Sequence, residues 1–209
     1  MAEIQAEPQV KKQRNNGARS REAILREAAQ LATVEGIDGL SIGRLADAVG
    51  MSKSGLFAHF GSKQELQLAT VERAGEVFTE QVIEPAGAAP NPLERLHQLG
   101  ELYFRHVEQL VYPGGCFFTS VSIELAARSG PVREVAVGYV NDWIDYLEET
   151  ATEAQADGSV RSSEDPAQLA FELEAILLLA NARFIAAPET DPMARSRRAY
   201  TARLAAATA

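Results

Sequence analysis

Hydrophobic residues recur at helical spacing along almost the whole chain. From Arg19 onward, Ile24, Leu25, Ala28 and Leu31 fall on one face of a helix, and Gly36 supplies a stop signal. Alternation of polar and apolar residues, the pattern of a half-buried strand, is not found over any useful length. Residues 1–18 are polar and lack apolar periodicity, which predicts a disordered arm. The pattern as a whole predicts an all-α fold of about nine helices.

Two short helices with a tight turn between them follow the first helix. The first, after Ser41, carries its apolar residues within about 100° of one another on a helical wheel, and ends at Gly50. The second, after Ser52, carries Leu56 and Phe60 at positions i and i+4. A serine in this place accepts a hydrogen bond from a free backbone N–H at the start of a helix. The arrangement predicts a helix-turn-helix.

Later helices are marked by their start and stop residues. Ser62 opens a fourth helix, expected from Lys63 to about Val82. Three prolines and a glycine in segment 84–92 predict a linker, because proline breaks a helix. Five more helices are expected at residues 92–112, 116–128, 131–157, 166–187 and 192–207. We divide the chain into the arm (1–18), a three-helix helix-turn-helix domain (19–66) and a larger C-terminal helical domain (67–209).

Charge divides the chain in a similar way. The formal net charge is -9, yet residues 11–63 hold nine lysines and arginines against five acids. Residues 64–209 hold 11 against 22. A basic segment on an acidic chain suits a polyanion such as DNA. The cations of the arm, among them Lys11 and Arg14, could read a minor groove or simply be solvated.

The outward face of the second short helix carries the candidate DNA contacts. A helix N-terminus favours anions, so Ser52 and Lys53 suit a phosphate or a base edge. Lys63 would hold the DNA backbone at the start of the next helix. His59 could instead be a packing residue. The complete candidate set is Ser41, Arg44, Ser52, Lys53, Ser54, Gly55, Phe57, His59 and Lys63.

The run from Ser41 to Leu66, SIGRLADAVGMSKSGLFAHFGSKQEL, resembles the DNA-binding signature of the tetracycline-repressor (TetR/AcrR) family of bacterial regulators. The match includes Gly50, Gly55, Phe60 and Lys63 and nearly every other position at which that signature is defined. Phe57 stands where a tyrosine is common, and Gly43 where a larger polar residue is usual. The likeness in layout covers about residues 19–207. It implies a homodimeric regulator that binds a palindrome-like DNA operator and is usually a repressor released by a small-molecule effector.

The segment from Ala175 to Ala180 (AILLLA) is apolar on every side of a helix, because each residue advances by about 100°. Such a helix must be covered all round, which favours a second copy of the chain as cover; a central helix in a monomer is the alternative. The resemblance also implies a dimer, formed by the last two long helices of each subunit. The candidate interface residues are Ile176, Leu177, Leu179 and Phe184.

Aromatic residues gather with isolated polar residues in the C-terminal domain, as in the lining of a small-molecule site. An ordinary aromatic core is the alternative. The candidate effector-pocket residues are Tyr103, Phe104, Phe117, Phe118, Ser120, Glu124, Trp143, Tyr146, Phe171 and Asn181. The resemblance implies a pocket in this domain without naming its ligand. We expect segment 84–92 and the fourth helix to transmit ligand binding to the helix-turn-helix.

Little in the sequence favours catalysis. Cys116 with His97 or His106 is the one plausible pair of nucleophile and base, but the histidines are nine residues apart and lie on opposite faces of a helix. Cys116 could be redox-sensing or a buried small residue. The sequence therefore predicts no enzyme, cofactor or metal site. Its longest apolar run is far short of the roughly 20 residues that cross a bilayer, and we expect a cytoplasmic protein.

Overall fold

The computed structural model describes residues 7–208, with side chains from Gly17 onward. Within this range the only β-structure is one isolated bridge between Val160 and Thr208. The helices are α1 (Glu7–Glu35), α2 (Ile42–Ala48), α3 (Lys53–Phe60), α4 (Lys63–Phe78), α5 (Glu84–Gly87), α6 (Pro92–Glu108), α7 (Phe117–Leu125), α8 (Pro131–Ala156), α9 (Pro166–Ala186) and α10 (Pro192–Ala207). A π-helical turn (Thr79–Ile83) joins α4 to α5, and a 3₁₀ turn (Pro188–Thr190) precedes α10. The all-α prediction is confirmed.

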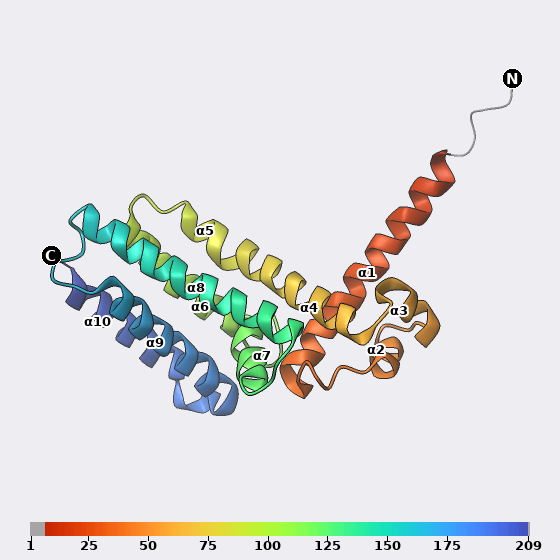
Figure 1. Ribbon diagram of the computed structural model, residues 1–209. Helices are drawn as coiled ribbons and strands as arrows, with labels where there is room; N and C mark the ends of the chain where they lie inside the picture. Colours follow the sequence, from red (N-terminus) through yellow and green to blue (C-terminus); the bar gives the residue numbers. More distant parts are fainter. Residues whose placement is uncertain (1–6, 209) are drawn as a thin grey trace, which may run out of the picture.

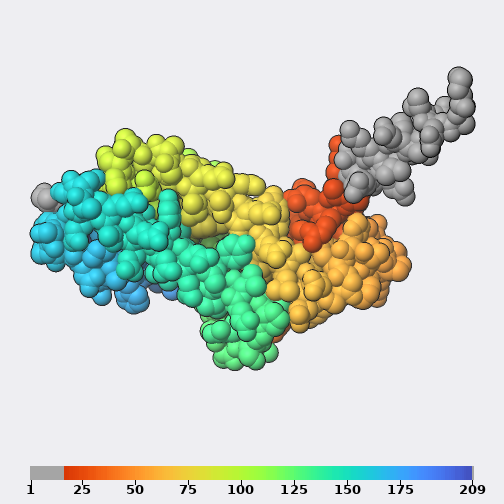
Figure 2. Space-filling view, turned by 45° about the horizontal axis from the view of Figure 1, so that its top comes forward, coloured from red at the N-terminus to blue at the C-terminus, as the bar shows by residue number. Residues whose placement is uncertain are grey.

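The molecule is elongated, with a small head and a larger body (Figure 1). The head consists of α2, α3 and the parts of α1 and α4 that pack on them. Helix α4 runs from the head into the body, where α8 contacts α4, α6, α7 and α9. Helix α10 lies along α9 and α6. Figure 2 shows the α2–α3 region at one end and α8 to α10 toward the other.

One connected cluster of buried apolar side chains runs through the head and the body. In the head, Ile24, Ala28, Leu45, Leu56 and Leu66 are fully buried. The body core includes Leu96, Leu99, Phe104, Phe117, Leu147, Leu169, Leu173 and Leu177. Removal of these side chains from water is the main force that holds the helices together.

Helix α1 begins earlier than the sequence predicts. Residues 7–18 are helical, although they were expected to belong to a disordered arm, and residues 1–6 lie outside the described range. Apolar periodicity reports which face of a helix is buried, whereas glutamine, lysine, arginine and alanine favour a helix even where nothing packs on it. A helix that is already anchored by Ile24 and Ala28 can therefore extend through a polar segment.

The linker expected at 84–92 is shorter than predicted. Through the π-turn the chain continues from α4 into α5, and the Glu84 N–H bonds to the Thr79 carbonyl five residues back. Pro85 lies in the first turn of α5, where a missing N–H costs little. The helical path ends only at Gly87, which leaves residues 88–91 as the turn before α6.

The predicted serine caps are present at all three helices of the head. Ser41 Oγ accepts from the Arg44 N–H and Ser52 Oγ from the Gly55 N–H, each at 3.1 Å. Ser62 Oγ accepts from the Glu65 N–H at 3.0 Å. The helices expected at 92–112 and 116–128 end earlier, at Glu108 and Leu125.

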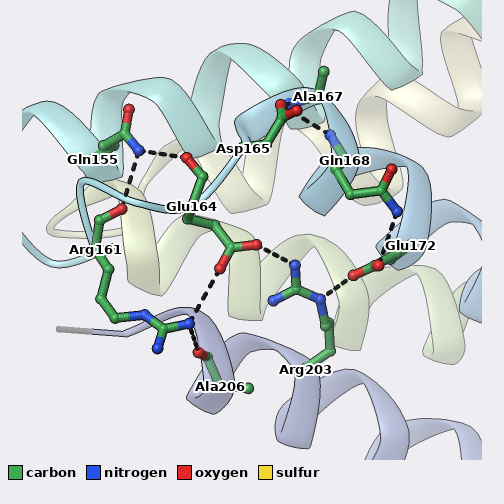
Figure 3. Close-up of polar contacts among 9 residues, drawn as sticks. All are labelled: Gln155, Arg161, Glu164, Asp165, Ala167, Gln168, Glu172, Arg203 and Ala206. Atoms are coloured by element: carbon green, nitrogen blue, oxygen red, sulfur yellow. Dashed lines mark hydrogen bonds and ion pairs between the residues drawn. The ribbon is translucent and has the colours of Figure 1, made fainter.

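The C-terminal end of the body is held by a polar network (Figure 3). Arg203 of α10 donates to Glu164 in the loop before α9 and to Glu172 within α9. The Gln155 amide donates to the Glu164 carbonyl at 2.7 Å. Asp165 caps α9 by accepting from the Ala167 N–H at 3.0 Å. These contacts fix α9 between α8 and α10 and so decide which of its faces remains uncovered.

Candidate nucleic-acid interface and ligand cavity

The head holds α3 rigidly against α2 and leaves one side of α3 open. Leu45 and Leu56 are fully buried, and Phe60 is nearly so. Gly50 in the intervening turn has a φ of 68°, a left-handed conformation that glycine adopts without strain. The Met51 N–H bonds to the Ala46 carbonyl at 2.8 Å and closes the turn. The predicted helix-turn-helix is confirmed as a structural unit.

The open side of α3 carries the residues expected to face DNA. Ser52, Lys53 and Ser54 are exposed, Phe57 keeps 48% of its surface exposed, and His59 is partly exposed. Ser54 Oγ lies 3.3 Å from Ser52 Oγ at the start of the helix. This polar edge lies at the N-terminus of a helix, where the backbone dipole favours an anion, and it is open to solvent.

Gly43 of α2 makes room for Lys53. A Cβ at position 43 would lie 2.9 Å from Lys53 Cε and 3.1 Å from its Nζ, so the lysine chain crosses the place where a side chain would stand. The glycine that departs from the usual family pattern is thus matched to the position of this cation.

Two of the expected phosphate-binding cations have partners within the chain. Arg44 lies 2.5 Å from Glu35, although its side chain is 63% exposed. Lys63 Nζ donates to the Asp38 carbonyl at 2.5 Å and also remains exposed. Exposed polar contacts of this kind contribute about 0–1 kcal/mol to stability. A phosphate can therefore replace Glu35 as the partner of Arg44, or the Asp38 carbonyl as the partner of Lys63, at little cost.

A joint between head and body forms at the turn after α1. Glu124 of α7 accepts from the Ile37 N–H at 2.7 Å and from the Asp38 N–H at 3.0 Å. Gln67 of α4 donates to the Ile37 carbonyl at 2.9 Å. A Cβ on Gly36 would lie 2.7 Å from Glu124 Oε1, so glycine permits this close approach. Glu124 therefore belongs to the joint and not to the effector pocket in which the sequence placed it.

The body contains a cavity of about 310 Å³ between α4, the π-turn, α6, α7, α8 and α9. Six aromatic residues line it: Phe78, Tyr103, Phe118, Tyr139, Trp143 and Tyr146. Four of them, Tyr103, Phe118, Trp143 and Tyr146, are among the predicted pocket residues. The other two, Phe78 and Tyr139, are absent from the predicted set because neither lies in a stretch that also contains a candidate polar residue.

The remaining predicted pocket residues lie elsewhere. Phe104 packs against Tyr200 with ring centroids 5.9 Å apart, and Phe117 packs against Tyr112 at 5.9 Å. Adjacent residues differ by about 100° around a helix, so Phe118 faces the cavity whereas Phe117 faces the core.

The polar and exposed members of that set also serve other purposes. Ser120 donates to the Gly114 carbonyl at 3.2 Å. Asn181 accepts from the Cys116 N–H at 2.8 Å. Phe171 is 66% exposed on the outer face of α9. None of these side chains lines the cavity.

Glu174 and Asp142 are charged residues of the cavity lining that the predicted set lacks, and Glu174 is the more buried of the two. It lines the cavity and accepts from Trp143 Nε1 at 2.6 Å. Burial raises the pKa of the Glu174 carboxyl from 4.5 to about 7, opposed by the hydrogen bond from Trp143. The sequence contains a signal for Glu174, because this acid lies directly before the apolar run 175–180 of α9. A helix packed among apolar side chains has no structural need for a charge at such a position.

Burial also shifts the pKa values of three other groups in or beside the cavity, Tyr103, Cys116 and His106, toward the neutral form at pH 7. Burial raises the pKa of Tyr103 well above its usual range, and its hydroxyl lies 3.2 Å from Thr119 Oγ1. Burial also raises the pKa of the buried Cys116 thiol, which disfavours the reactive thiolate. Behind Phe78, burial lowers the pKa of His106 to about 4, and its Nδ1 lies 2.7 Å from Gln81 Oε1.

Helix α9 presents an uncovered apolar face. Leu179 is 60% exposed, and Phe171, Leu178 and Ile185 are exposed as well. Leu177, predicted for the interface between subunits, has no exposed surface because it packs inside its own subunit. Ile176 and Phe184 are partly exposed. The interface prediction is therefore wrong for Leu177, since a helix covered on one side by its own chain cannot offer that side to a partner.

Across residues 7–208, no helix combines the length and the apolar character that crossing a membrane requires.

Comparison with known families agrees with this architecture. Residues 24–70 match the model described as "Bacterial regulatory proteins, tetR family". Residues 92–200, more than half of the chain, match "Tetracyclin repressor-like, C-terminal domain". The chain belongs to the TetR family of bacterial transcriptional regulators, which are not enzymes.

Individual relatives show the same fold. The chain is 32% identical to the HTH-type transcriptional regulator TcmR of Streptomyces glaucescens over 79 residues, which is 37% of this chain and 34% of TcmR. A TetR regulator from Chloroflexus aurantiacus J-10-fl superposes with a TM-score of 0.82 at 23% identity, over 91% of this chain and 95% of the other. AibR in complex with isovaleryl coenzyme A and operator DNA gives 0.65 at 27% identity, over 79% and 85%. The chain thus spans about a third of the length of TcmR and most of both solved structures.

Proposed function

We propose that this protein is a homodimeric repressor whose affinity for a DNA operator is lowered by a small molecule bound in the body cavity. The observation that carries the proposal is the position of α7. This one helix lines the cavity through Phe118 and Thr119 and holds the head through Glu124.

The open side of α3 would enter the major groove. Lys53 and Ser54, at the start of the helix, would contact phosphates or base edges, and Phe57 would contact a sugar or a thymine methyl. The exposed Arg44 and Lys63 would exchange their partners within the chain for phosphates on either side of the groove. His59 lies near the end of α3 and would contact the DNA only along its partly exposed edge.

A single head reads few base pairs, so operator recognition requires two. The uncovered apolar face of α9, with α10 beside it, would pair with the same face of a second copy. Two heads related by a two-fold axis would then read a palindrome-like site, with the half-site spacing set by the distance between the two copies of α3. The acidic body would keep DNA away from the rest of the surface.

Two helices connect the cavity to the head. Helix α7 connects Phe118 at the cavity to Glu124 at the joint, and α4 connects Phe78 at the cavity to Gln67 at the same joint. A ligand that favours one position of these helices favours one position of the heads. By thermodynamic linkage, the ligand changes operator affinity by the same factor by which DNA changes ligand affinity. This factor is typically about 5- to 150-fold.

One solved structure supports the part of this proposal that concerns the two partners, a ligand and an operator. The AibR structure holds a ligand and operator DNA in the same complex. For the present chain we propose the same two kinds of partner, with ligand and operator of its own.

The test is a fluorescence anisotropy titration of the full chain against DNA from upstream of its own gene. We expect binding that weakens steeply with salt and saturates at one dimer for each half-site pair. A lack of binding even at low salt would contradict the proposal. Tighter binding in the presence of an effector would contradict only the repressor part, because it would indicate a corepressor.

A further inference from the structure

We propose that the body cavity takes an apolar organic cation, such as an aromatic or alkyl ammonium compound, held by the carboxylate of Glu174 within a wall of aromatic side chains. This inference rests on the proposed function, since it names the chemical class of the effector. It is argued from the charges and rings that line the cavity.

The aromatic wall is continuous across four helices. The ring of Phe78 meets that of Trp143 edge to face, with centroids 5.2 Å apart and an interplanar angle of 89°. Its centroid lies 6.3 Å from those of Tyr103 and Phe118, and Phe118 in turn lies 5.0 Å from Tyr139. Aromatic rings carry negative potential on their faces and attract cations within about 6 Å, most strongly where water is excluded.

The charged groups of the cavity have one sign. Glu174 and Asp142 line it, and among the described residues no lysine, arginine or histidine does. His106, on the far side of Phe78, is neutral at pH 7. A carboxylate or phosphate ligand would place a second negative charge near Glu174 in a poorly solvated site. A cation is attracted by both carboxylates and by the rings, so it is the ligand class that the cavity favours.

Glu174 has binding capacity left for a ligand. Within the described part of the chain its one hydrogen-bond donor is Trp143 Nε1, whereas an ionised carboxylate can accept about four bonds. Keeping such a group beside a hydrophobic cavity costs free energy in the empty protein. A bound cation would offset that cost. Cation binding therefore explains the presence of a carboxylate at this position, whereas packing alone does not.

The size of the cavity limits the ligand to a small one. Its volume of about 310 Å³ is at the lower end of the roughly 300–1,000 Å³ typical of small-molecule sites. A cation with one or two rings would fill it.

The pH dependence of cation binding follows from the state of Glu174. Its titratable neighbours are Tyr103 of α6, Cys116 just before α7, Asp142 of α8 and Tyr200 of α10. Burial raises the pKa of both tyrosines and of the thiol, so these groups stay neutral near pH 7. Glu174 itself is then the group that titrates near pH 7. Below that pH its carboxyl carries a proton, which a bound cation must displace. Affinity for a permanently charged cation should rise about tenfold between about pH 6 and pH 8.

The sole tryptophan of the chain, Trp143, reports on the cavity directly, because it lines the wall and bonds to Glu174. We suggest titrating the full-length protein with phenyltrimethylammonium, with its neutral isostere tert-butylbenzene and with benzenesulfonate, each followed by tryptophan fluorescence at pH 8. The cation should bind more tightly than the neutral isostere, and the sulfonate should bind most weakly.

Glu174→Gln should weaken cation binding by about tenfold or more while leaving tert-butylbenzene binding unchanged, because the variant removes the negative charge that attracts the ammonium group and keeps the shape of the side chain. The matched control is Asp145→Asn, which removes an exposed carboxylate of α8 outside the cavity lining and should leave both affinities unchanged. The pH profile of the unmodified protein gives a second test that does not depend on the folding of a variant.

The inference is overturned if the neutral isostere or the sulfonate binds as tightly as the cation, if none of the three binds, or if cation affinity is flat across pH 7. These results are independent of the DNA titration. If the protein binds the cation but does not bind DNA, only the proposed function is refuted. If it binds DNA but not the cation, only this inference is refuted.

Discussion

At the scale of single residues, we propose that the head separates cations that position DNA from those that read it. Lys63 stands at the start of α4 and donates to the Asp38 carbonyl, and we propose that from this position it contacts only the DNA backbone. Lys53 stands at the N-terminus of α3, across Gly43, and we propose that from this position it contacts both base edges and phosphates. The two lysines should therefore differ in what their loss does to DNA binding.

Lys63→Ala should weaken binding to all DNA sequences alike and reduce the slope of log affinity against log salt by about two, one for each subunit of the dimer. Lys53→Ala should weaken binding as well, and in addition should narrow the gap between operator and random DNA. Anisotropy titrations at several salt concentrations measure both effects. Arg105→Ala, an exposed change on α6, is the control that should do neither. Equal losses on every sequence from both lysine variants would contradict the assigned roles.

Glu174 makes a second prediction at this scale, on stability. Its pKa is raised to about 7 in the folded protein, so between the unfolded value of 4.5 and 7 the folded state binds more protons and stability falls as pH rises. Glu174→Gln removes this loss. Chemical denaturation should show the variant as stable as the unmodified protein at about pH 4.5 but more stable by up to about 3 kcal/mol at pH 8. If the stability difference between Glu174→Gln and the unmodified protein did not change with pH, the pKa of the Glu174 carboxyl would not be raised in the folded protein.

At the scale of elements, the joint between α7 and the turn after α1 is the contact most suited to carry a signal. Both carboxylate oxygens of Glu124 are engaged by backbone N–H groups of the head. The contact is polar and partly exposed, so it can break and re-form without disturbing a core. That property distinguishes it from the packing of α4 on α1.

Glu124→Ala should leave the Ile37 and Asp38 N–H groups without their acceptor, at a cost of about 1–3 kcal/mol. Amide hydrogen exchange should become faster in segment 36–39 while exchange in the α8 and α9 core stays unchanged. Glu134→Ala, an exposed change near the start of α8, is a control without such an effect. Unchanged protection at 36–39 would show that α7 does not hold the head.

At the scale of the whole molecule, the uncovered face of α9 should determine the oligomeric state. Leu179 is exposed there, and Ile123 of α7 is an equally exposed residue on a different surface, at 63%. Leu179→Glu should convert a dimer to a protomer of 22.6 kDa, because it places a charge in an apolar contact with its own copy. Light scattering after size-exclusion chromatography measures the mass, and the operator affinity should fall with it.

Ile123→Glu is the matched change, and its mass should remain that of the unmodified protein. If Leu179→Glu left the mass unchanged while Ile123→Glu reduced it, the interface would lie on α7 and not on α9. A protomer mass for the unmodified protein would contradict the dimer altogether.

The sequence by itself determined that the fold is helical, where the helices of the head are capped, and the character of the head. Ser41, Ser52 and Ser62 could be assigned as caps because a cap depends on residues three positions apart, and the burial of Leu56 and Phe60 follows from helical spacing. The family signature is likewise local. These features need no knowledge of what a helix packs against.

Only the tertiary structure decided which side chains meet across helices. Phe117 and Phe118 are equivalent in sequence, and the rotation of α7 against α8 sends one to the core and the other to the cavity. Glu124 bonds to a turn 87 residues earlier in the chain, and Glu174 bonds to Trp143 from 31 residues away. Such contacts depend on how whole helices are rotated and shifted against each other, and that arrangement is fixed by the packing of all the buried side chains together.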